Sequence, residues 1–252
     1  MLSLKTQNWF IDGVETVIFD KDGTFIDLHY FWGKMTELRA QEVIKTYNTP
    51  HIKVSTLCKF LGYDTDNSQM LPDGITALYS RSKIIEIFKT NLYEIGINST
   101  TEELETIFDN VSQEFYKNIQ EYTKPIEDAI EFIKQLYARG IKLGIVTADS
   151  VESTNLTLKQ FGWEEYFDVV IGRESSSSTK ESGIPTIMAL EKLNAHLKTA
   201  IMIGDSPTDM ISAKNAGIER TILVSTGQVS IEELEKYSPY TTNKLSNILI
   251  SG

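Results

Sequence analysis

Two aspartates separated by a single lysine follow a short apolar run in the stretch VIFDKDGTFIDLHYFW, residues 17–32. The run has the continuous apolarity of a strand covered on both faces, yet it ends in Asp20, and Asp22 follows two positions later. Side chains two residues apart on an extended chain point the same way, so we expect both carboxylates at one end of the strand. Two neighbouring carboxylates can act as nucleophile and as general acid when their environments differ. Gly23 and Thr24 then let the chain turn sharply away.

Four further residues capable of chemistry stand at or beyond the ends of later apolar runs: Thr147, Lys180, Asp205 and Asp209. Ligands of open α/β sheets bind beyond the carboxyl ends of the strands, where these side chains would meet Asp20. Carboxylates gathered away from water are costly unless a cation binds them. A hard divalent ion with oxygen ligands, most simply Mg²⁺, meets that need and lets an anionic phosphoryl group approach a carboxylate.

A parallel sheet is needed to bring these residues together, and five apolar runs of strand length supply it. They cover residues 16–20, 141–149, 167–172, 199–205 and 221–225. Helical patterns lie between the later runs, and alternating strands and helices are typical of a doubly wound α/β domain. We therefore predict an α/β fold with a doubly wound parallel sheet of the Rossmann-like kind.

Cap residues set the expected helix limits. The first pattern, PIEDAIEFIKQLYARG at residues 125–140, is expected to place Tyr137 on the same helix face as three isoleucines. It is expected to stop at Gly140. In the next, Asp149 is the expected N-cap and Glu152 completes a capping box. Ser206 is the expected N-cap of a later helix that opens on Pro207.

One interval breaks the alternation, because residues 28–122 read as helical throughout. An all-helical insert between the first strand and the rest is best interpreted as a cap domain over the strand ends. The expected domains are therefore a core of residues 1–27 with 123–252 and a helical cap of residues 28–122.

Composition narrows the classes of function. Thirty-five acidic against twenty-four basic residues give a formal net charge of −11, which argues against nucleic-acid and anionic-membrane partners. Cys58 is the single cysteine, so no intrachain disulfide is expected. No signal-peptide pattern opens the sequence and no apolar run reaches about 18 residues, so we expect a cytoplasmic protein. The oligomeric state is left open.

The motifs FDKDGT, VTAD and GDSPTD, with Lys180 between the last two, occur in the order and spacing of the four motifs of the haloacid dehalogenase-like hydrolase superfamily. The resemblance spans about residues 14–227, and the helical insert stands where that family carries a helical cap. In cap type the chain is similar to phosphoglycolate phosphatases.

The resemblance implies a role for each residue of the first two motifs. Asp20 would be the nucleophile that becomes an aspartyl-phosphate and also a metal ligand. Asp22 would protonate the leaving group, activate the hydrolytic water, and offer its main-chain carbonyl to the metal. Thr147 and the backbone N–H of Ala148 would donate hydrogen bonds to the phosphoryl oxygens.

The last two motifs complete the implied site. Lys180 would neutralise the transferring group and steady Asp20, although Glu181 stands where a proline often follows that lysine. Asp205 would bind the metal directly, and Asp209 through water or through Lys180. The resemblance thus implies a metal set of Asp20, Asp22, Asp205 and Asp209, with Mg²⁺ as the expected cofactor.

Members of the resembled family that cleave carbon–halogen or carbon–phosphorus bonds lack an aspartate at the second motif position, so with Asp22 present the resemblance implies hydrolysis of a phosphate ester. A cap of this size favours small phosphorylated metabolites as substrates. Two alternatives stay open: a phosphomutase of the β-phosphoglucomutase type and a non-catalytic binding module on the same fold. Neither the substrate nor the cap residues that select it can be read from the sequence.

Overall fold

The computed structural model describes residues 2–252, and contacts within the chain divide it into two compact units. One unit combines the chain up to Asp27 with the chain from Pro125 onward, and the other runs from Leu28 to Lys124. Each unit has its own buried apolar residues.

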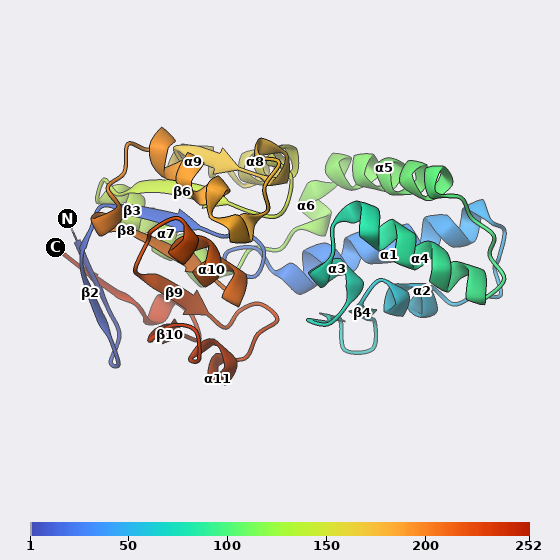
Figure 1. Ribbon diagram of the computed structural model, residues 1–252, viewed down its shortest axis with the longest axis horizontal. Coiled ribbons are helices and arrows are strands. Elements are labelled where there is room, and N and C mark those ends of the chain that lie inside the picture. Colours follow the sequence, from blue (N-terminus) through green and yellow to red (C-terminus); the bar gives the residue numbers. More distant parts are fainter. Residues whose placement is uncertain (1) are drawn as a thin grey trace. The chain divides into compact units, whose positions relative to one another are not determined.

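A six-stranded parallel sheet in the order β10-β9-β8-β3-β6-β7 forms the centre of the first unit (Figure 1). The strands are β3 (Thr16–Phe19), β6 (Lys142–Val146), β7 (Val169–Ile171), β8 (Ala200–Gly204), β9 (Thr221–Val224) and β10 (Tyr240–Thr242). After β3 the chain extends the sheet through β6 and β7, then returns to the other side of β3 with β8. This reversal confirms the doubly wound α/β fold and creates a switch point between β3 and its neighbours.

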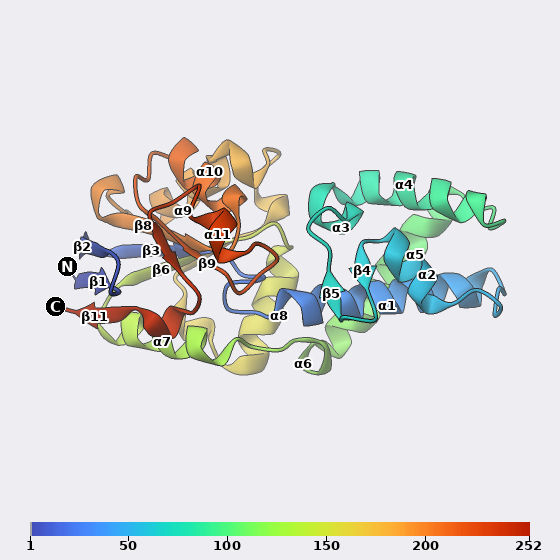
Figure 2. The same cartoon turned by 90° about the horizontal axis from the view of Figure 1, so that it is seen from below.

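Helices cover both faces of this sheet, and in Figure 2 α9 and α10 lie on one side and α7 on the other. The helices are α7 (Glu127–Ala138), α8 (Val151–Phe161), α9 (Ile184–Lys192), α10 (Pro207–Asn215) and α11 (Ile231–Leu234). Under α9 and α10, Ile18 and Met202 of the central strands pack with Leu190 and Ala213. Every residue of β3 and β8 is buried, which explains their continuous apolar sequences.

Two details of the expected helices are wrong and one is confirmed. The N-cap of α8 is Ser150, whose hydroxyl accepts from the Ser153 N–H at 3.0 Å, and not Asp149. The Asp149 carboxylate is engaged elsewhere, as described below. Tyr137 is 42% exposed on α7, because Leu136 takes the buried position. Ser206 does cap α10, with Pro207 as its first residue.

A small antiparallel sheet, in the order β11-β1-β2, was absent from the sequence-based prediction. Its strands are β1 (Leu2–Lys5), β2 (Phe10–Val14) and β11 (Leu249–Ser251). β10 of the main sheet was likewise not predicted. The remaining turns of this unit are 3-10 helices η1 (Glu164–Tyr166), η2 (Arg173–Ser175), η3 (Lys180–Ser182), η4 (Leu197–Thr199) and η5 (Leu245–Asn247).

The second unit is mainly helical. Its helices are α1 (Leu28–Thr46), α2 (Val54–Phe60), α3 (Ile75–Leu78), α4 (Arg81–Glu94), α5 (Thr101–Lys117) and α6 (Ile119–Tyr122). Phe31, Phe88, Phe108 and Phe115 are buried in its core. The reading of this interval as helical throughout is wrong at one place, where β4 (Tyr63–Asp64) and β5 (Gln69–Met70) form a short hairpin.

Among residues 2–252, no helix is both long enough and apolar enough to cross a lipid bilayer.

Candidate active site

The site is built around Asp20, the first residue after β3. Its backbone N–H donates to the Ile203 carbonyl of β8 at 2.8 Å, so the end of β3 is tied to the neighbouring strand. The next residues turn tightly, because the Lys21 carbonyl accepts from the N–H groups of three residues, Thr24, Phe25 and Ile26. Gly23 has a φ of +92°, a conformation that other residues rarely adopt. The turn thus holds the Asp20 carboxylate at the end of a buried strand.

Three buried aspartates meet at this point. Asp20 follows β3, Asp205 follows β8, and Asp209 lies in the first turn of α10. One carboxylate oxygen of each lies within 4.8 Å of the others. Asp209 is fixed by the helix cap, because its Oδ2 accepts from both the N–H and the Oγ of Ser206, each at 3.0 Å. The parallel sheet therefore gathers carboxylates that lie up to 189 positions apart in the chain.

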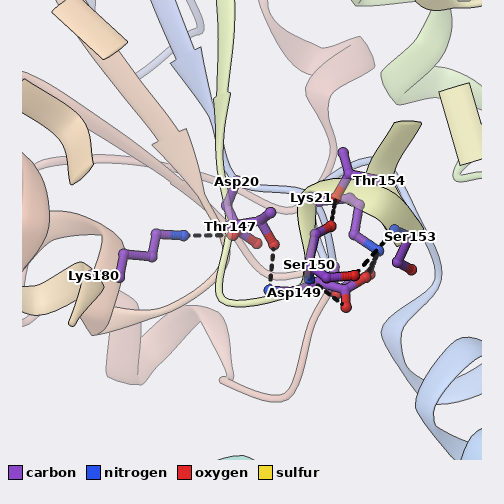
Figure 3. Close-up of polar contacts among 9 residues, drawn as sticks. Asp20, Lys21, Thr147, Asp149, Ser150, Ser153, Thr154 and Lys180 are labelled. Atoms are coloured by element: carbon purple, nitrogen blue, oxygen red, sulfur yellow. Dashed lines mark hydrogen bonds and ion pairs between the residues drawn. The ribbon is translucent and has the colours of Figure 1, made fainter. Parts of the chain in front are cut away.

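Lys180 joins this acidic cluster through its side chain. Its Nζ lies 2.5 Å from Asp20 Oδ1 and 2.6 Å from Asp209 Oδ1. Figure 3 shows the ammonium approaching Asp20 from the segment that carries η3. This segment is anchored on α10, because Asn215 Nδ2 donates to the Glu181 carbonyl at 2.7 Å. The lysine that the sequence placed in a polar loop is therefore a buried, doubly ion-paired residue.

Thr147 lies beyond β6, the strand that pairs with β3. Its N–H donates to the Ile171 carbonyl at 3.0 Å, and its Oγ1 accepts from the Asp149 N–H at 3.1 Å (Figure 3). A hydroxyl that accepts in this way keeps its own proton for donation. Ala148, next in the chain, is exposed.

Two glycines enclose the Asp205 carboxylate, a feature the sequence reading missed. A Cβ at Gly23 would lie 2.4 Å from Asp205 Oδ2, and one at Gly227 would lie 1.7 Å from the same atom. Gly227 belongs to the loop after β9, which is tied to the first turn because Thr226 Oγ1 donates to the Gly23 carbonyl at 2.5 Å. A glycine two residues beyond the apolar run 221–225 was the available signal.

The Asp22 carboxylate pairs with Lys21 and is not one of the three clustered carboxylates. Its Oδ1 lies 2.7 Å from the Nζ of Lys21, which in turn lies 2.9 Å from Asp149 Oδ2. The three-carboxylate group does not include the Asp22 side chain. The sequence assigned no role to Lys21 and assigned Asp149 only the cap of α8, because nothing in their spacing shows that two separate loops meet.

The electrostatics of the acidic cluster favour a bound cation. Burial raises the pKa of Asp20 to about 7, although Lys180 opposes the rise, and burial together with Asp20 and Asp209 raises the pKa of Asp205 well above its usual value. Burial alone would lower the pKa of Lys180, but its two aspartate partners raise it, so the ammonium stays charged. When all three carboxylates are ionised, they and the one ammonium carry a net charge of −2. A divalent ion with oxygen ligands fits both that charge and the donor set.

Comparisons with known proteins agree with this geometry. Residues 17–224 match the family model described as haloacid dehalogenase-like hydrolase. A protein of Caldanaerobacter subterraneus subsp. tengcongensis, provisionally named pyrophosphatase PpaX, is 30% identical over 226 residues, which cover 90% of this chain and 88% of that protein. The pyrophosphatase PpaX of Bacillus mycoides is 25% identical over 237 residues, covering 94% and 95%.

Solved structures show the same fold. A predicted phosphoglycolate phosphatase from Haemophilus somnus superposes with a TM-score of 0.71 at 16% identity, covering 94% of this chain and 97% of that one. A protein provisionally identified as a beta-phosphoglucomutase of Thermotoga maritima gives 0.69 at 20% identity, covering 92% and 95%. With the family model and the curated relatives, the chain belongs to the haloacid dehalogenase-like hydrolases and is an enzyme of the phosphatase type.

Proposed function

We propose that this enzyme is an Mg²⁺-dependent phosphatase that hydrolyses a small phosphate monoester through an aspartyl-phosphate on Asp20. The observation that carries the proposal is the buried Asp20 carboxylate, held 2.5 Å from Lys180 and grouped with Asp205 and Asp209. A carboxylate is a competent nucleophile toward phosphorus when nearby positive charge neutralises the incoming phosphoryl group.

Asp20, Asp205 and Asp209 would hold the metal, together with the main-chain carbonyl of Asp22. When bound, the ion supplies the positive charge that lets an anionic phosphoryl group approach these carboxylates. Both oxygens of Asp209 already have partners, Ser206 and Lys180, so its larger contribution is to orient Lys180.

In the first half of the reaction, an Asp20 oxygen bonds to phosphorus while the ester P–O bond breaks. Thr147 Oγ1 and the Ala148 N–H would donate to the phosphoryl oxygens, and Lys180 would balance their charge. Asp22 gives its proton to the departing alcohol oxygen.

In the second half, Asp22 acts as the base. It takes a proton from a water molecule, whose oxygen bonds to phosphorus as the bond to Asp20 breaks. Phosphate leaves and Asp20 is restored, so the carboxylates end the cycle unchanged.

The helical unit would act as the cap domain of residues 28–122, and closure over the site would admit small phosphorylated metabolites and exclude nucleic acids and membranes. A cytoplasmic location remains a prediction from the sequence. Inorganic pyrophosphate is the second candidate substrate, because curated relatives that match over 83% or more of this chain bear the name pyrophosphatase PpaX.

The proposal is tested by measuring phosphate release from p-nitrophenyl phosphate, a panel of phosphorylated metabolites and pyrophosphate, with Mg²⁺ and with a chelator. We expect Mg²⁺-dependent turnover that Asp20→Asn abolishes while the thermal unfolding profile is retained. Near-normal activity of Asp20→Asn would exclude Asp20 as the nucleophile. Transfer of the phosphoryl group to a sugar phosphate, with little release of free phosphate, would favour the phosphomutase. Absence of turnover with every substrate of the panel would favour the non-catalytic binding module.

A further inference from the structure

Lys21 lies between the two aspartates of the first motif, yet its ammonium faces neither Asp20 nor solvent. The side chain is fully buried and its Nζ lies 2.7 Å from Asp22 Oδ1 and 2.9 Å from Asp149 Oδ2. A buried ammonium is costly unless charge partners surround it, and the Asp22 and Asp149 carboxylates supply that charge to Lys21.

The Lys21 contact restricts how the Asp22 carboxylate can turn. Asp22 Oδ1 is shielded from solvent, whereas the whole side chain is 11% exposed, so its exposed part lies outside this oxygen. A carboxylate with one oxygen fixed can no longer rotate about its last torsion, and the direction of Oδ2 is then set as well.

Asp149 is itself held by several hydrogen bonds, which makes it an anchor for Lys21. Its Oδ1 accepts from the Ser150 N–H at 2.8 Å, and its carbonyl accepts from the Arg173 N–H at 2.9 Å. Its own N–H donates to Thr147 Oγ1, so the same residue also orients the hydroxyl proposed to bind the phosphoryl group. Figure 3 shows Lys21 reaching Asp149 beside the start of α8.

We propose that Lys21 and Asp149 form a clamp that positions Asp22 for proton transfer to the leaving group. Both are positioning residues that act through Asp22 and do not touch the substrate. The inference rests on the proposed function, in which Asp22 is the general acid. Oδ1 stays with Lys21, Oδ2 carries the proton, and that proton passes to the ester oxygen as its bond to phosphorus breaks.

Leaving-group dependence separates this role from a structural one. p-Nitrophenolate departs with little help from an acid, whereas the more basic phenolate of phenyl phosphate needs its proton. The double variant Lys21→Met with Asp149→Asn removes one positive and one negative charge together. We expect its kcat/KM for phenyl phosphate to fall at least about tenfold further than its kcat/KM for p-nitrophenyl phosphate, since a positioned acid contributes about 10²- to 10⁴-fold.

A double-mutant cycle with Asp22→Asn tests whether the clamp acts through Asp22. Added to Asp22→Asn, the clamp variant should change the ratio of the two kcat/KM values less than about twofold. The proposal would be overturned if the clamp variant, made in the wild-type background, lowered kcat/KM equally for both substrates. It would also be overturned if the clamp variant changed the ratio just as much in the Asp22→Asn background.

Two controls keep the result interpretable. Arg220→Met breaks hydrogen bonds to the Asp12 and Lys198 carbonyls at the opposite end of the strands, and should lower stability without changing the ratio. If the clamp variant does not fold, Asp149→Asn alone keeps the Lys21–Asp22 pair and should still change the ratio at least about threefold. If Asp149→Asn leaves the ratio of the two kcat/KM values unchanged, the clamp proposal is overturned. If the wild-type enzyme shows no turnover that depends on Asp20, the proposed function is overturned instead.

Discussion

Asp20 is surrounded by more negative than positive charge. Asp209, Asp205 and Asp22 all lie near enough to interact with it, and Lys180 is the cation in direct contact. In the metal-free protein, burial and then the charges of Asp209 and Asp22 raise the pKa of Asp20 to about 7, against the opposing effect of Lys180. Ionisation of the cluster should therefore be linked to metal binding.

The first prediction concerns thermal stability and pH. The folded-state pKa of Asp20 is raised to about 7 from an unfolded value of 3.8, so the folded protein holds more protons between these pH values. Metal-free stability from this group should therefore fall as pH rises from about 4 to about 7. The proposed Mg²⁺ would bind the ionised form, so its stabilising effect on Tm should be larger at pH 8 than at pH 5. Differential scanning fluorimetry at both pH values measures this.

Asp205→Asn serves as the matched control for that measurement, because it removes one carboxylate oxygen ligand at nearly constant volume. The Mg²⁺-induced shift in Tm should disappear in this variant at both pH values. An equal Mg²⁺ effect in wild type and variant would remove Asp205 from the metal site.

The second prediction concerns Gly227. A methyl group there would lie 1.7 Å from Asp205 Oδ2, so Gly227→Ala must displace either the carboxylate or the loop. We expect the Mg²⁺ concentration for half-maximal activity to rise at least about tenfold, which corresponds to about 1.4 kcal/mol. Gly162→Ala is the control, because a Cβ at that left-handed helix end meets nothing within 4 Å. It should leave the Mg²⁺ requirement unchanged.

Local sequence could predict the individual residues of the site but not their pairings. Asp20, Asp205 and Asp209 were predicted together because parallel strands end at one edge of a sheet. Lys21 and Asp149 are 128 positions apart; from the sequence Lys21 has no evident partner and Asp149 is expected only to cap a helix. Their contact depends on the shape of two turns, which no spacing encodes.

At the scale of single elements, α8 shows how neighbouring polar residues compete for one cap. Asp149 and Ser150 are both favoured N-cap residues, and Asp149 was expected to cap with Glu152. Because Lys21 binds the Asp149 carboxylate, Ser150 takes the cap position and accepts from the Ser153 N–H.

The third prediction follows from that cap. Ser150→Ala should lower the free energy of unfolding by about 1 kcal/mol, since it leaves an N-terminal N–H of α8 without its acceptor. Glu152→Ala should cost little, because no capping box involves this residue. Urea denaturation of both variants distinguishes them. A larger loss for Glu152→Ala would restore the cap assigned from sequence.

Burial explains which strands could be predicted. β3 and β8 lie inside the sheet and are buried along their whole length, so their apolar runs are unmistakable. β10 has three residues at the edge of the main sheet, and β1 and β11 are four and three residues long with partly exposed faces. Such strands are defined by distant pairing partners, which local periodicity cannot show.

At the scale of the whole molecule, the two units have separate apolar cores. In the helical unit, Phe108 is fully buried and the Arg39 guanidinium lies 4.2 Å from its ring centroid. The ring therefore supports both apolar packing and a cation–π contact. Loss of this ring should affect the helical unit before the sheet unit.

The fourth prediction tests that separation. Phe108→Ala should destabilise the helical unit by about 3–5 kcal/mol, the usual cost of removing a buried aromatic ring. Hydrogen exchange should accelerate across residues 28–124 and change little in β3 and β8. Tyr93→Ala is the control, since that side chain is 71% exposed. Equal acceleration in both units would show that they unfold as one.

The pairing of β1 with β11 places the two ends of the described chain on one small sheet, and Figures 1 and 2 both show them side by side. β2 leads directly into the beginning of β3, whereas Asp20 follows the end of that strand. An affinity tag or surface tether at either end would therefore attach on the side of the core remote from the acidic cluster. Enzyme immobilised through either end of the chain should therefore keep the acidic cluster turned away from the support.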